Sequence, residues 1–237
     1  MMRRLPAIEN AGVGAWLVRL FEDIDEGNLP WVLALTRKCE QAFGGALVDL
    51  VPSYTTVLVQ YDPLRLHPQQ AKRELHTLLA DLSPATAESS GQLRELPVWY
   101  GPSVGPDLER LAREKSMSVE ELVALHTGQE YRVYALGFAP GFAFMGSVHP
   151  RLEAPRLSTP RPRVYPGSVA LAGRQTSAYP TQSPGGWNLL GRTPLTLFER
   201  SRQPMSFLQI GDRVQLVPVS KEEFLRLGGD ATPQEDH

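Results

Sequence analysis

The stretch Tyr131–Gly146, YRVYALGFAPGFAFMG, joins a strand-forming run to a glycine–proline turn and a second run rich in phenylalanine. The same alternation of strand-forming runs and glycine–proline turns continues to Pro194, with eight Gly and nine Pro in residues 137–194. Between the turns lie short apolar runs at 133–138, 169–172, 195–198 and 214–217. Short strands separated by Gly/Pro turns are typical of all-β barrels and sandwiches. The sequence therefore predicts such a domain over residues 131–230.

The first hundred residues alternate between strand and helix signals. Tyr54–Tyr61 (YTTVLVQY) is rich in β-branched and aromatic residues, which favour strands. Asn28 and Pro30 are typical of a helix start, and Gly44 of a helix end. The predicted elements are a strand at 15–21, a helix at 28–44, strands at 47–51 and 54–61, a helix at 68–82 and a strand at 96–100. This β-α-β-β-α-β order predicts an α+β protein in which residues 1–102 form a ferredoxin-like α/β domain.

Two short helices are predicted between these domains. The second begins with a capping box, in which Ser118 precedes Glu121 by three residues, and Gly128 ends it. We expect residues 103–130 to form a helical connector between two bodies. The polar tail, residues 231–237, is expected to fray.

Composition excludes several classes of protein. The 237 residues carry a net charge of −2, so neither nucleic acid nor an acidic membrane is expected as a partner. The single cysteine, Cys39, excludes an internal disulfide and a zinc site built on cysteines. No apolar run approaches the ~20 residues that span a bilayer, and the first ten residues lack a signal peptide's apolar stretch. A cytoplasmic soluble protein is expected.

Basic residues concentrate in the second half of the chain. Residues 131–217 contain ten basic and three acidic side chains, and all ten basic residues are arginine. The planar guanidinium suits carboxylate and phosphate groups. We therefore expect an anion-facing surface in this region, although each arginine taken alone fits an ordinary solvated surface.

The common catalytic signatures are absent apart from one. The sequence has no P-loop and no H-E-x-x-H motif, and its five histidines show no ligand spacing, so no metal site is expected. Gly101–Gly105 matches G-x-S-x-G, with Ser103 as a candidate nucleophile and His126 as a candidate base. The flanking sequence lacks the repeated βαβ units of a hydrolase sheet. A serine hydrolase is kept as an alternative hypothesis.

The Gly/Pro-rich turns supply the candidate binding residues. Glycine permits close approach of a backbone, and successive amides can bind an anion. Nearby aromatic, hydroxyl, amide and guanidinium groups suit a small amide or carboxylate ligand. The alternative is that these turns are structural and that their aromatic side chains fill the interior of the barrel. The candidates are Gly137, Phe138, Gly141, Phe142, Gln175, Thr176, Ser183, Gly185, Gly186, Trp187, Arg192 and Thr193.

Four of these segments carry a resemblance to a known family. GFAPGFAFMG (137–146), PRPRVYPGS (160–168), AGRQTSAYP (172–180) and SPGGWNLLGRTP (183–194) resemble the family of the 5-oxoprolinase B subunit, also called KipI and allophanate hydrolase subunit 1. The resemblance extends to Gly105-Pro106-Asp107-Leu108 and Leu125-His126 and covers nearly the whole chain. It implies a ferredoxin-like domain followed by a cyclophilin-like β-barrel, and a carboxyltransferase domain like that of urea carboxylase.

The resemblance also implies a function. Family members act with the 5-oxoprolinase C and A subunits as an ATP-dependent enzyme, with Mg²⁺ as the counter-ion of ATP, that opens 5-oxoproline to L-glutamate. The chain alone is expected to be inactive. The alternative within the family is a KipI-type inhibitor that binds a sensor histidine kinase.

His126 is the only histidine at a position that matches the family. It is a candidate catalytic residue for proton transfer or, alternatively, a structural hydrogen-bonding group. The chain departs from the family pattern at Ser103, Tyr165, Arg174 and Ser177. Arg174 and Ser177 replace turn glycines, which puts the exact substrate in doubt.

Overall fold

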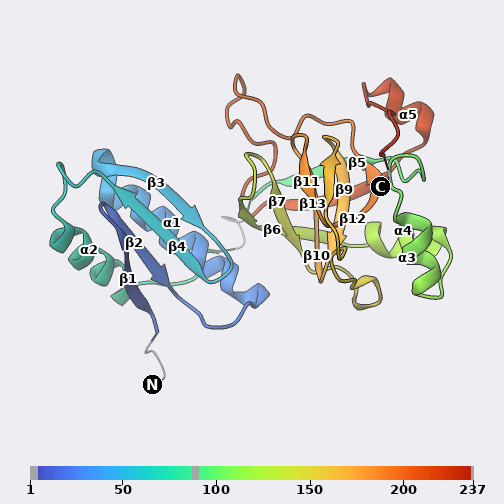
Figure 1. Ribbon diagram of the computed structural model, residues 1–237. Helices are drawn as coiled ribbons and strands as arrows, with labels where there is room; N and C mark the ends of the chain where they lie inside the picture. The colour runs from blue at the N-terminus through green and yellow to red at the C-terminus, as the bar shows by residue number, and fades with distance from the viewer. Residues whose placement is uncertain (1–4, 87–90, 236–237) are drawn as a thin grey trace. The chain divides into compact units, whose positions relative to one another are not determined.

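The computed structural model describes residues 5–86 and 91–235, and the chain divides into unit 1 (residues 1–90) and unit 2 (residues 91–237) (Figure 1). The division falls before the boundary at residue 102 that the sequence analysis predicts. The reason is that the last strand assigned to the first domain belongs to unit 2.

Unit 1 is a four-stranded antiparallel sheet with two helices. Its strands lie in the order β1-β2-β4-β3. Val18, Val57 and Val59 from the sheet share one core with Leu35 and Leu75 from the helices, and all five are fully buried. The elements are β1 (Ala7–Gly12), β2 (Ala15–Arg19), α1 (Leu29–Phe43), β3 (Leu47–Pro52), β4 (Thr56–Tyr61) and α2 (Pro68–Ala80).

The order of this sheet explains which part of the ferredoxin-like prediction was wrong. Strands β2, β4 and β3 and both helices lie close to the predicted ranges. The predicted last strand at 96–100 does not join them. The edge beside β2 is occupied instead by β1, which the sequence analysis did not predict and which pairs with β2 as a hairpin. The exact β-α-β-β-α-β arrangement is therefore not observed.

Unit 2 contains a seven-stranded sheet in the order β12-β9-β10-β7-β6-β13-β5. Its two edge strands meet at Trp99 and Arg192, whose amides each donate to the other's carbonyl at 2.9 Å. The sheet is thus nearly closed, which confirms a barrel-like second half. The strands are β5 (Leu93–Val98), β6 (Glu130–Leu136), β7 (Ala143–Gly146), β9 (Ser168–Ala172), β10 (Gln175–Ala178), β12 (Asn188–Arg192) and β13 (Arg213–Pro218).

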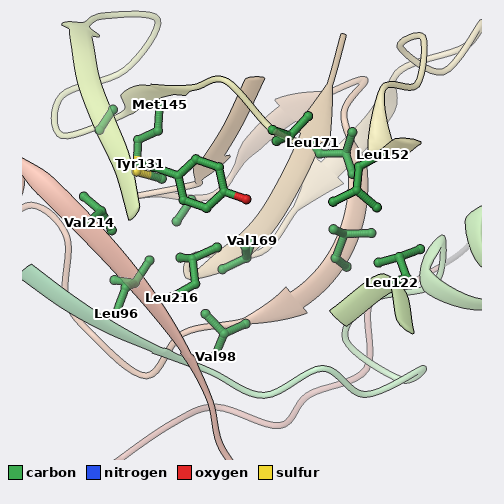
Figure 2. Close-up of a cluster of buried hydrophobic side chains, with 14 of the residues drawn as sticks. Leu96, Val98, Leu122, Tyr131, Met145, Leu152, Val169, Leu171, Val214 and Leu216 are labelled. Carbon is green, nitrogen blue, oxygen red and sulfur yellow. The ribbon is translucent and has the colours of Figure 1, made fainter. Parts of the chain in front are cut away.

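Strand β5 belongs to unit 2 because its apolar side chains are buried in that core. Leu96 and Val98 are fully buried there, and β5 pairs in parallel with β13. Figure 2 shows Leu96 and Val98 on the same side of the core as Val214 and Leu216 of β13, with Tyr131 pointing inward from β6. Removal of these apolar side chains from water favours this placement, by about 25 cal/mol for each Å² of apolar surface buried.

The two short helices lie within unit 2. α3 (Leu108–Glu114) and α4 (Val119–Thr127) bury Leu108, Leu111 and Leu122 in the same core as the barrel strands. The connector predicted at 103–130 is thus part of the second body. Ser118 caps α4 as predicted, since its hydroxyl accepts from the Glu121 amide at 3.1 Å.

Further elements of unit 2 lie outside the seven-stranded sheet. A short ladder joins β8 (Arg161–Val164) to β11 (Ser183–Gly185), and α5 (Lys221–Arg226) follows β13. The tail expected to fray is ordered as far as residue 235: Gln234 is only 6% exposed, and its main-chain amide donates to the Ser103 carbonyl at 2.7 Å. None of the helices in the described ranges combines the length and apolar character needed to cross a bilayer.

Candidate functional site

The turn between β6 and β7 is held by its own main chain. The Gly137 amide donates to the Phe142 carbonyl at 3.1 Å. Gly141 has φ = +83°, and a Cβ there would lie 2.7 Å from Cβ of Phe198, so glycine is required. Phe138 also has a positive φ, 67°, and 65% of the residue is exposed. Such strained non-glycine backbone concentrates at functional sites, which makes this turn a candidate.

Next to this turn, five aromatic rings form a cluster. The Phe142 ring lies at its centre, with centroids 5.2 Å from Phe138, 5.2 Å from Tyr179 and 5.6 Å from Trp187. The rings meet edge to face, an arrangement that stabilises beyond the burial of area. They surround a cavity of about 80 Å³, the aromatic pocket, lined by Phe138, Phe142, Phe144, Arg156, Tyr179, Gly185, Gly186 and Trp187.

One cation lies at the rim of the aromatic pocket. Arg156 is exposed, and its guanidinium carbon lies 5.9 Å from the Trp187 ring centroid. Burial raises the pKa of Tyr179, while a hydrogen bond with the Trp187 main chain and the charges of Arg156 and Arg161 oppose that rise. The pocket therefore combines apolar walls with a positive potential.

A larger pocket, the open pocket, is lined by the Gly137–Gly141 turn. Its volume is about 540 Å³, within the range typical of small-molecule sites. Phe138 lines both pockets. The opposite wall consists of uncharged residues: Phe198, Pro204, Met205, Ser206 and Gln209.

The structure thus brings together part of the predicted site. Phe138, Phe142, Gly185, Gly186 and Trp187 line the aromatic pocket, and Gly137 and Gly141 line the open pocket. The remaining candidates line neither of these two pockets: His126, Gln175, Thr176, Ser183, Arg192 and Thr193.

Three residues of the aromatic pocket were not among the candidates. Phe144 lies two residues after Phe142, so a strand places both side chains on the same face. That period could have identified Phe144. Tyr179 follows β10 within a quoted motif, whereas Arg156 lies in a segment with no motif at all.

His126 is fully buried, with both ring nitrogens bonded to protein groups. Nδ1 lies 2.9 Å from the Tyr100 hydroxyl, and Nε2 lies 2.9 Å from the Thr176 hydroxyl. The Thr176 hydroxyl donates its proton to the Ala170 carbonyl at 3.0 Å, so it must accept from Nε2–H. Nδ1 then accepts from Tyr100, which makes the imidazole neutral. Burial lowers the pKa of His126 to about 3.

This geometry bears on two roles considered for His126. Both ring nitrogens already have protein partners, which fits the structural hydrogen-bonding role better than proton transfer to a ligand. The hydrolase alternative needed His126 as a base for Ser103, yet the ring nitrogens bond Tyr100 and Thr176 instead. The G-x-S-x-G match lacks its catalytic context.

Asp107, from the Gly-Pro-Asp-Leu motif, organises a second buried polar cluster. Its carboxylate accepts from Arg161 at 2.9 and 3.2 Å, from Arg110 at 3.1 Å and from the Leu189 amide at 2.8 Å. Arg110 also donates to the Asn188 side chain at 2.7 Å. The cluster ties α3 to β8 and β12.

Most of the arginines of residues 131–217 bond to other groups of the protein. Arg161 is buried against Asp107, and Arg151 and Arg213 pair with Glu121 and Glu130. Others donate to main-chain carbonyls, namely Arg132, Arg192 and Arg202. Of the arginines counted toward the predicted anion-facing surface, Arg156 is the one that lines the aromatic pocket. Across residues 5–86 and 91–235, no three His, Cys, Asp or Glu side chains gather in a way that could hold a metal ion.

The chain is similar to proteins of known family. The family model described as "Carboxyltransferase domain, subdomain C and D" matches residues 6–208. A protein of Bacillus subtilis (strain 168), named as the B subunit of 5-oxoprolinase, is 38% identical over 227 residues, which cover 92% of this chain and 94% of that one.

Solved structures agree on the fold. The crystal structure of TTHA0988 matches with a TM-score of 0.77 and 38% identity, covering 87% of this chain but only 40% of that chain. This chain thus spans well under half of that longer protein. The Kluyveromyces lactis urea amidolyase shares the fold at 17% identity, with a TM-score of 0.73 over 92% of this chain and 15% of that one. The matches in sequence and structure, over nearly the whole chain, place it in the family of the 5-oxoprolinase B subunit.

Proposed function

We propose that this chain is the B subunit of an ATP-dependent 5-oxoprolinase, which acts with the C and A subunits to open 5-oxoproline to L-glutamate. The observation that carries the proposal is the 38% identity to a 5-oxoprolinase B subunit over 92% of this chain. Because the reaction consumes ATP, we place the complex in the cytoplasm.

The aromatic pocket supports a role for this chain in binding the substrate. 5-Oxoproline is a flat five-membered lactam with two ring methylenes and one carboxylate. The methylenes suit the edges of Phe142 and Trp187, and the carboxylate suits the guanidinium of Arg156. A cavity of about 80 Å³ suits one small ring rather than an extended ligand.

ATP does not fit either pocket by itself. The aromatic pocket is too small for a nucleotide, and the open pocket is lined by no arginine or lysine that could bind phosphates. We therefore propose that Mg²⁺ and ATP are bound by groups that the C subunit contributes to the complex. Attack of the lactam oxygen on the γ-phosphorus would form an O–P bond and release ADP. Addition of water to the activated carbon would then break the ring C–N bond, with the protonated nitrogen as the leaving group, and leave γ-glutamyl phosphate. A second water would release phosphate from this acyl phosphate and give L-glutamate.

The open pocket supports contact with another protein of the complex. Phe138 is 65% exposed and Met205 is 45% exposed, and both line this pocket. Aromatic residues and methionine are enriched in the cores of protein interfaces. We assign the open pocket to the binding of the C subunit. This contact would bring the nucleotide held by the C subunit close to the aromatic pocket, because Phe138 lines both pockets.

Reconstitution tests the proposal. The chain alone should release no ADP in response to 5-oxoproline, and the mixture with the C and A subunits should do so. Within the active mixture, Arg156→Gln should raise the KM for 5-oxoproline by about tenfold or more, because it removes a charge-assisted hydrogen bond. Arg200→Gln is the matched control, since Arg200 is also exposed but lines neither pocket.

Two outcomes contradict different parts of the proposal. No activity in the reconstituted mixture, with a known 5-oxoprolinase active in parallel, would overturn the assignment to this enzyme. Specific binding to a sensor histidine kinase in that case would support the KipI-type inhibitor. An unchanged KM in Arg156→Gln would overturn the aromatic pocket as the substrate site and leave the assignment to the enzyme intact.

A further inference from the structure

Arg192 has a guanidinium that is almost fully buried and only partly bonded. It is 1% exposed. Nη1 donates to the carbonyls of Asp230 and Thr232, each at 2.8 Å. Nε and Nη2 have no hydrogen-bond partner in the described part of the chain, and no carboxylate in residues 5–86 or 91–235 lies within ion-pair distance. The charge of Asp230 acts on the guanidinium only from beyond ion-pair distance. A buried cation without a close ion-pair partner is costly, so this position calls for an explanation.

The unpartnered atoms share one edge of the guanidinium plane. Nε–H and one N–H of Nη2 point in parallel from that edge, which matches the two oxygens of a carboxylate or phosphate. The opposite edge, at Nη1, is occupied by the two carbonyls. The bonded and unbonded edges are therefore separate, and the unbonded one is complete for bidentate binding.

A second unpartnered group lies on the same face of the sheet as Arg192. Ser168 on β9 is directly opposite Arg192 on β12, and directly opposite residues place their side chains on the same face of a sheet. Ser168 is fully buried, and its hydroxyl also has no hydrogen-bond partner in the described residues. Gly167 has φ = +80°, and a Cβ there would lie 3.2 Å from Cγ of Arg192, so glycine leaves room beside the arginine stem.

The chain's own tail covers this place. We define the C-terminal strap as residues 230–235. Gln234 holds the strap in place: its side chain accepts from the Tyr165 amide at 3.2 Å and donates to the Arg163 carbonyl at 2.8 Å. The Tyr165 ring lies 5.2 Å from the guanidinium carbon of Arg192. The strap is polar and largely exposed apart from Gln234. Besides the Gln234 side chain, it is held by the bond from the Gln234 main-chain amide to Ser103 and by the two carbonyls on Arg192.

We propose that Arg192 and Ser168 form a binding site for an oxyanion, a carboxylate or phosphate group, and that the C-terminal strap is a releasable cover over it. An anion with two oxygens would accept from Nε and Nη2 of Arg192, and the Ser168 hydroxyl would donate to it. Release of the strap lets the anion enter. The site does not depend on the proposed function, because it shares no lining residue with the aromatic pocket.

Release of the strap by mutation tests the proposal on the full chain. Gln234→Ala removes the side-chain bonds that hold the strap. It should bind inorganic phosphate or acetate about tenfold more tightly than the unmodified chain, as measured by calorimetry. Comparison of the two anions decides between phosphate and carboxylate as the natural group. Gln215→Ala is the matched control, because it also loses a glutamine's bonds to carbonyls, but on β13.

A second substitution shows where the anion binds. Ser168→Ala in the Gln234→Ala background should weaken anion binding about tenfold, since a charge-assisted hydrogen bond is lost. By itself Ser168→Ala should not lower thermal stability, because that hydroxyl has no partner to lose. Hydrogen exchange of the main-chain amide at position 234, which donates to the Ser103 carbonyl, should be faster in Gln234→Ala and report the release of the strap.

The alternative is that Arg192 serves only to hold the strap. In that case Gln234→Ala would speed exchange of the main-chain amide at position 234 but bind neither anion, and the proposal would be overturned. Equal anion affinity with and without the Ser168 hydroxyl would overturn it as well. Because Ser168→Ala keeps Arg192 and the fold, this result does not depend on replacing the buried arginine.

Discussion

Asp107 and Arg161, 54 residues apart, form a bidentate ion pair with side chains only 5% and 8% exposed. The pair joins the start of α3 to β8, and so links two of the sequence segments on which the family resemblance rests. Removing one partner of a buried pair leaves an uncompensated charge, whereas an exposed pair contributes little.

We therefore expect Asp107→Asn to lower the free energy of unfolding by about 3–5 kcal/mol. Arg161→Met should cost a similar amount, and the double variant should lose less than the sum, which a double-mutant cycle in denaturant would measure. The comparison pair is Glu223 and Arg226, with side chains 38% and 71% exposed. Its cycle should give a much smaller coupling, because solvent screens an exposed pair. Equal coupling in both cycles would contradict this account.

The hydrogen bonds that link Tyr100, His126 and Thr176 hold a buried, neutral imidazole, so we expect the stability of the protein to fall in acid. Burial holds the pKa of His126 at about 3 in the folded state, against 6.5 as the ordinary value. Between these values the unfolded chain binds a proton that the folded one does not. The stabilisation is therefore complete above pH 6.5 and is lost as the pH falls toward 3, by up to about 1.4 kcal/mol per pH unit.

Denaturant unfolding at pH 7, 6, 5 and 4 measures this effect. His126→Gln should be less stable at pH 7, but the difference from the unmodified chain should shrink as the pH falls. His76→Gln is the control, because His76 is exposed on α2. A stability difference for His126→Gln that does not change with pH would show that the imidazole is not held neutral.

The main features of the second unit could be predicted from sequence because they rest on local signals. Gly/Pro turns separate its short strands, and Ser118 marks the start of a helix by its own side chain. Strand β5 was assigned to the wrong unit because its partner β13 begins 120 residues later, at Arg213 paired with Leu93. Local sequence indicates a strand but not its neighbour. Strand β1, AIENAG, was missed because it lacks a clear alternation of apolar and polar residues.

The candidate site shows the same limit. Phe142, Gly185 and Trp187 were predicted because their motifs stand out, and the fold brings them together. Arg156 carries no motif, and only the fold places it beside Trp187. Composition also overestimated the anion-facing surface, since a count of arginines does not show which of them bond to the protein itself.

Gly185 offers a way to alter the aromatic pocket without changing its charge. A Cβ at this position would lie 2.2 Å from the Tyr179 hydroxyl oxygen, so Gly185→Ala must displace the tyrosine ring. If the pocket holds 5-oxoproline, the variant should raise the KM of the reconstituted enzyme about tenfold. Gly186→Ala is the control, because a Cβ there lies 3.6 Å from the Pro160 side chain, an ordinary contact. Similar KM values in both variants would contradict substrate binding in this pocket.

Ser103→Ala should leave every activity of the reconstituted enzyme unchanged. The Ser103 carbonyl accepts from the Gln234 main-chain amide, a bond that alanine preserves. His126 cannot serve as its base while it is bonded to Tyr100 and Thr176. An esterase assay with an activated ester, run beside the ADP-release assay, checks both points. Loss of an esterase activity in the variant would restore the serine hydrolase hypothesis.

Cys39 provides a specific probe of unit 1. It is fully buried on α1, and burial, together with the charges of Glu40 and Glu74, raises the pKa of its thiol to about 12. Because the thiolate is the reactive form, alkylation of the folded protein at pH 8 should be slower than that of an exposed cysteine by a factor on the order of 10³. Labelling should become fast only when denaturant unfolds unit 1, since Cys39 is the only cysteine in the chain. Cys39→Ser, which should take up no label under any condition, is the control. Rapid labelling of the native protein would mean that α1 opens readily, and that the core containing Leu35 and Cys39 is less stable than its complete burial implies.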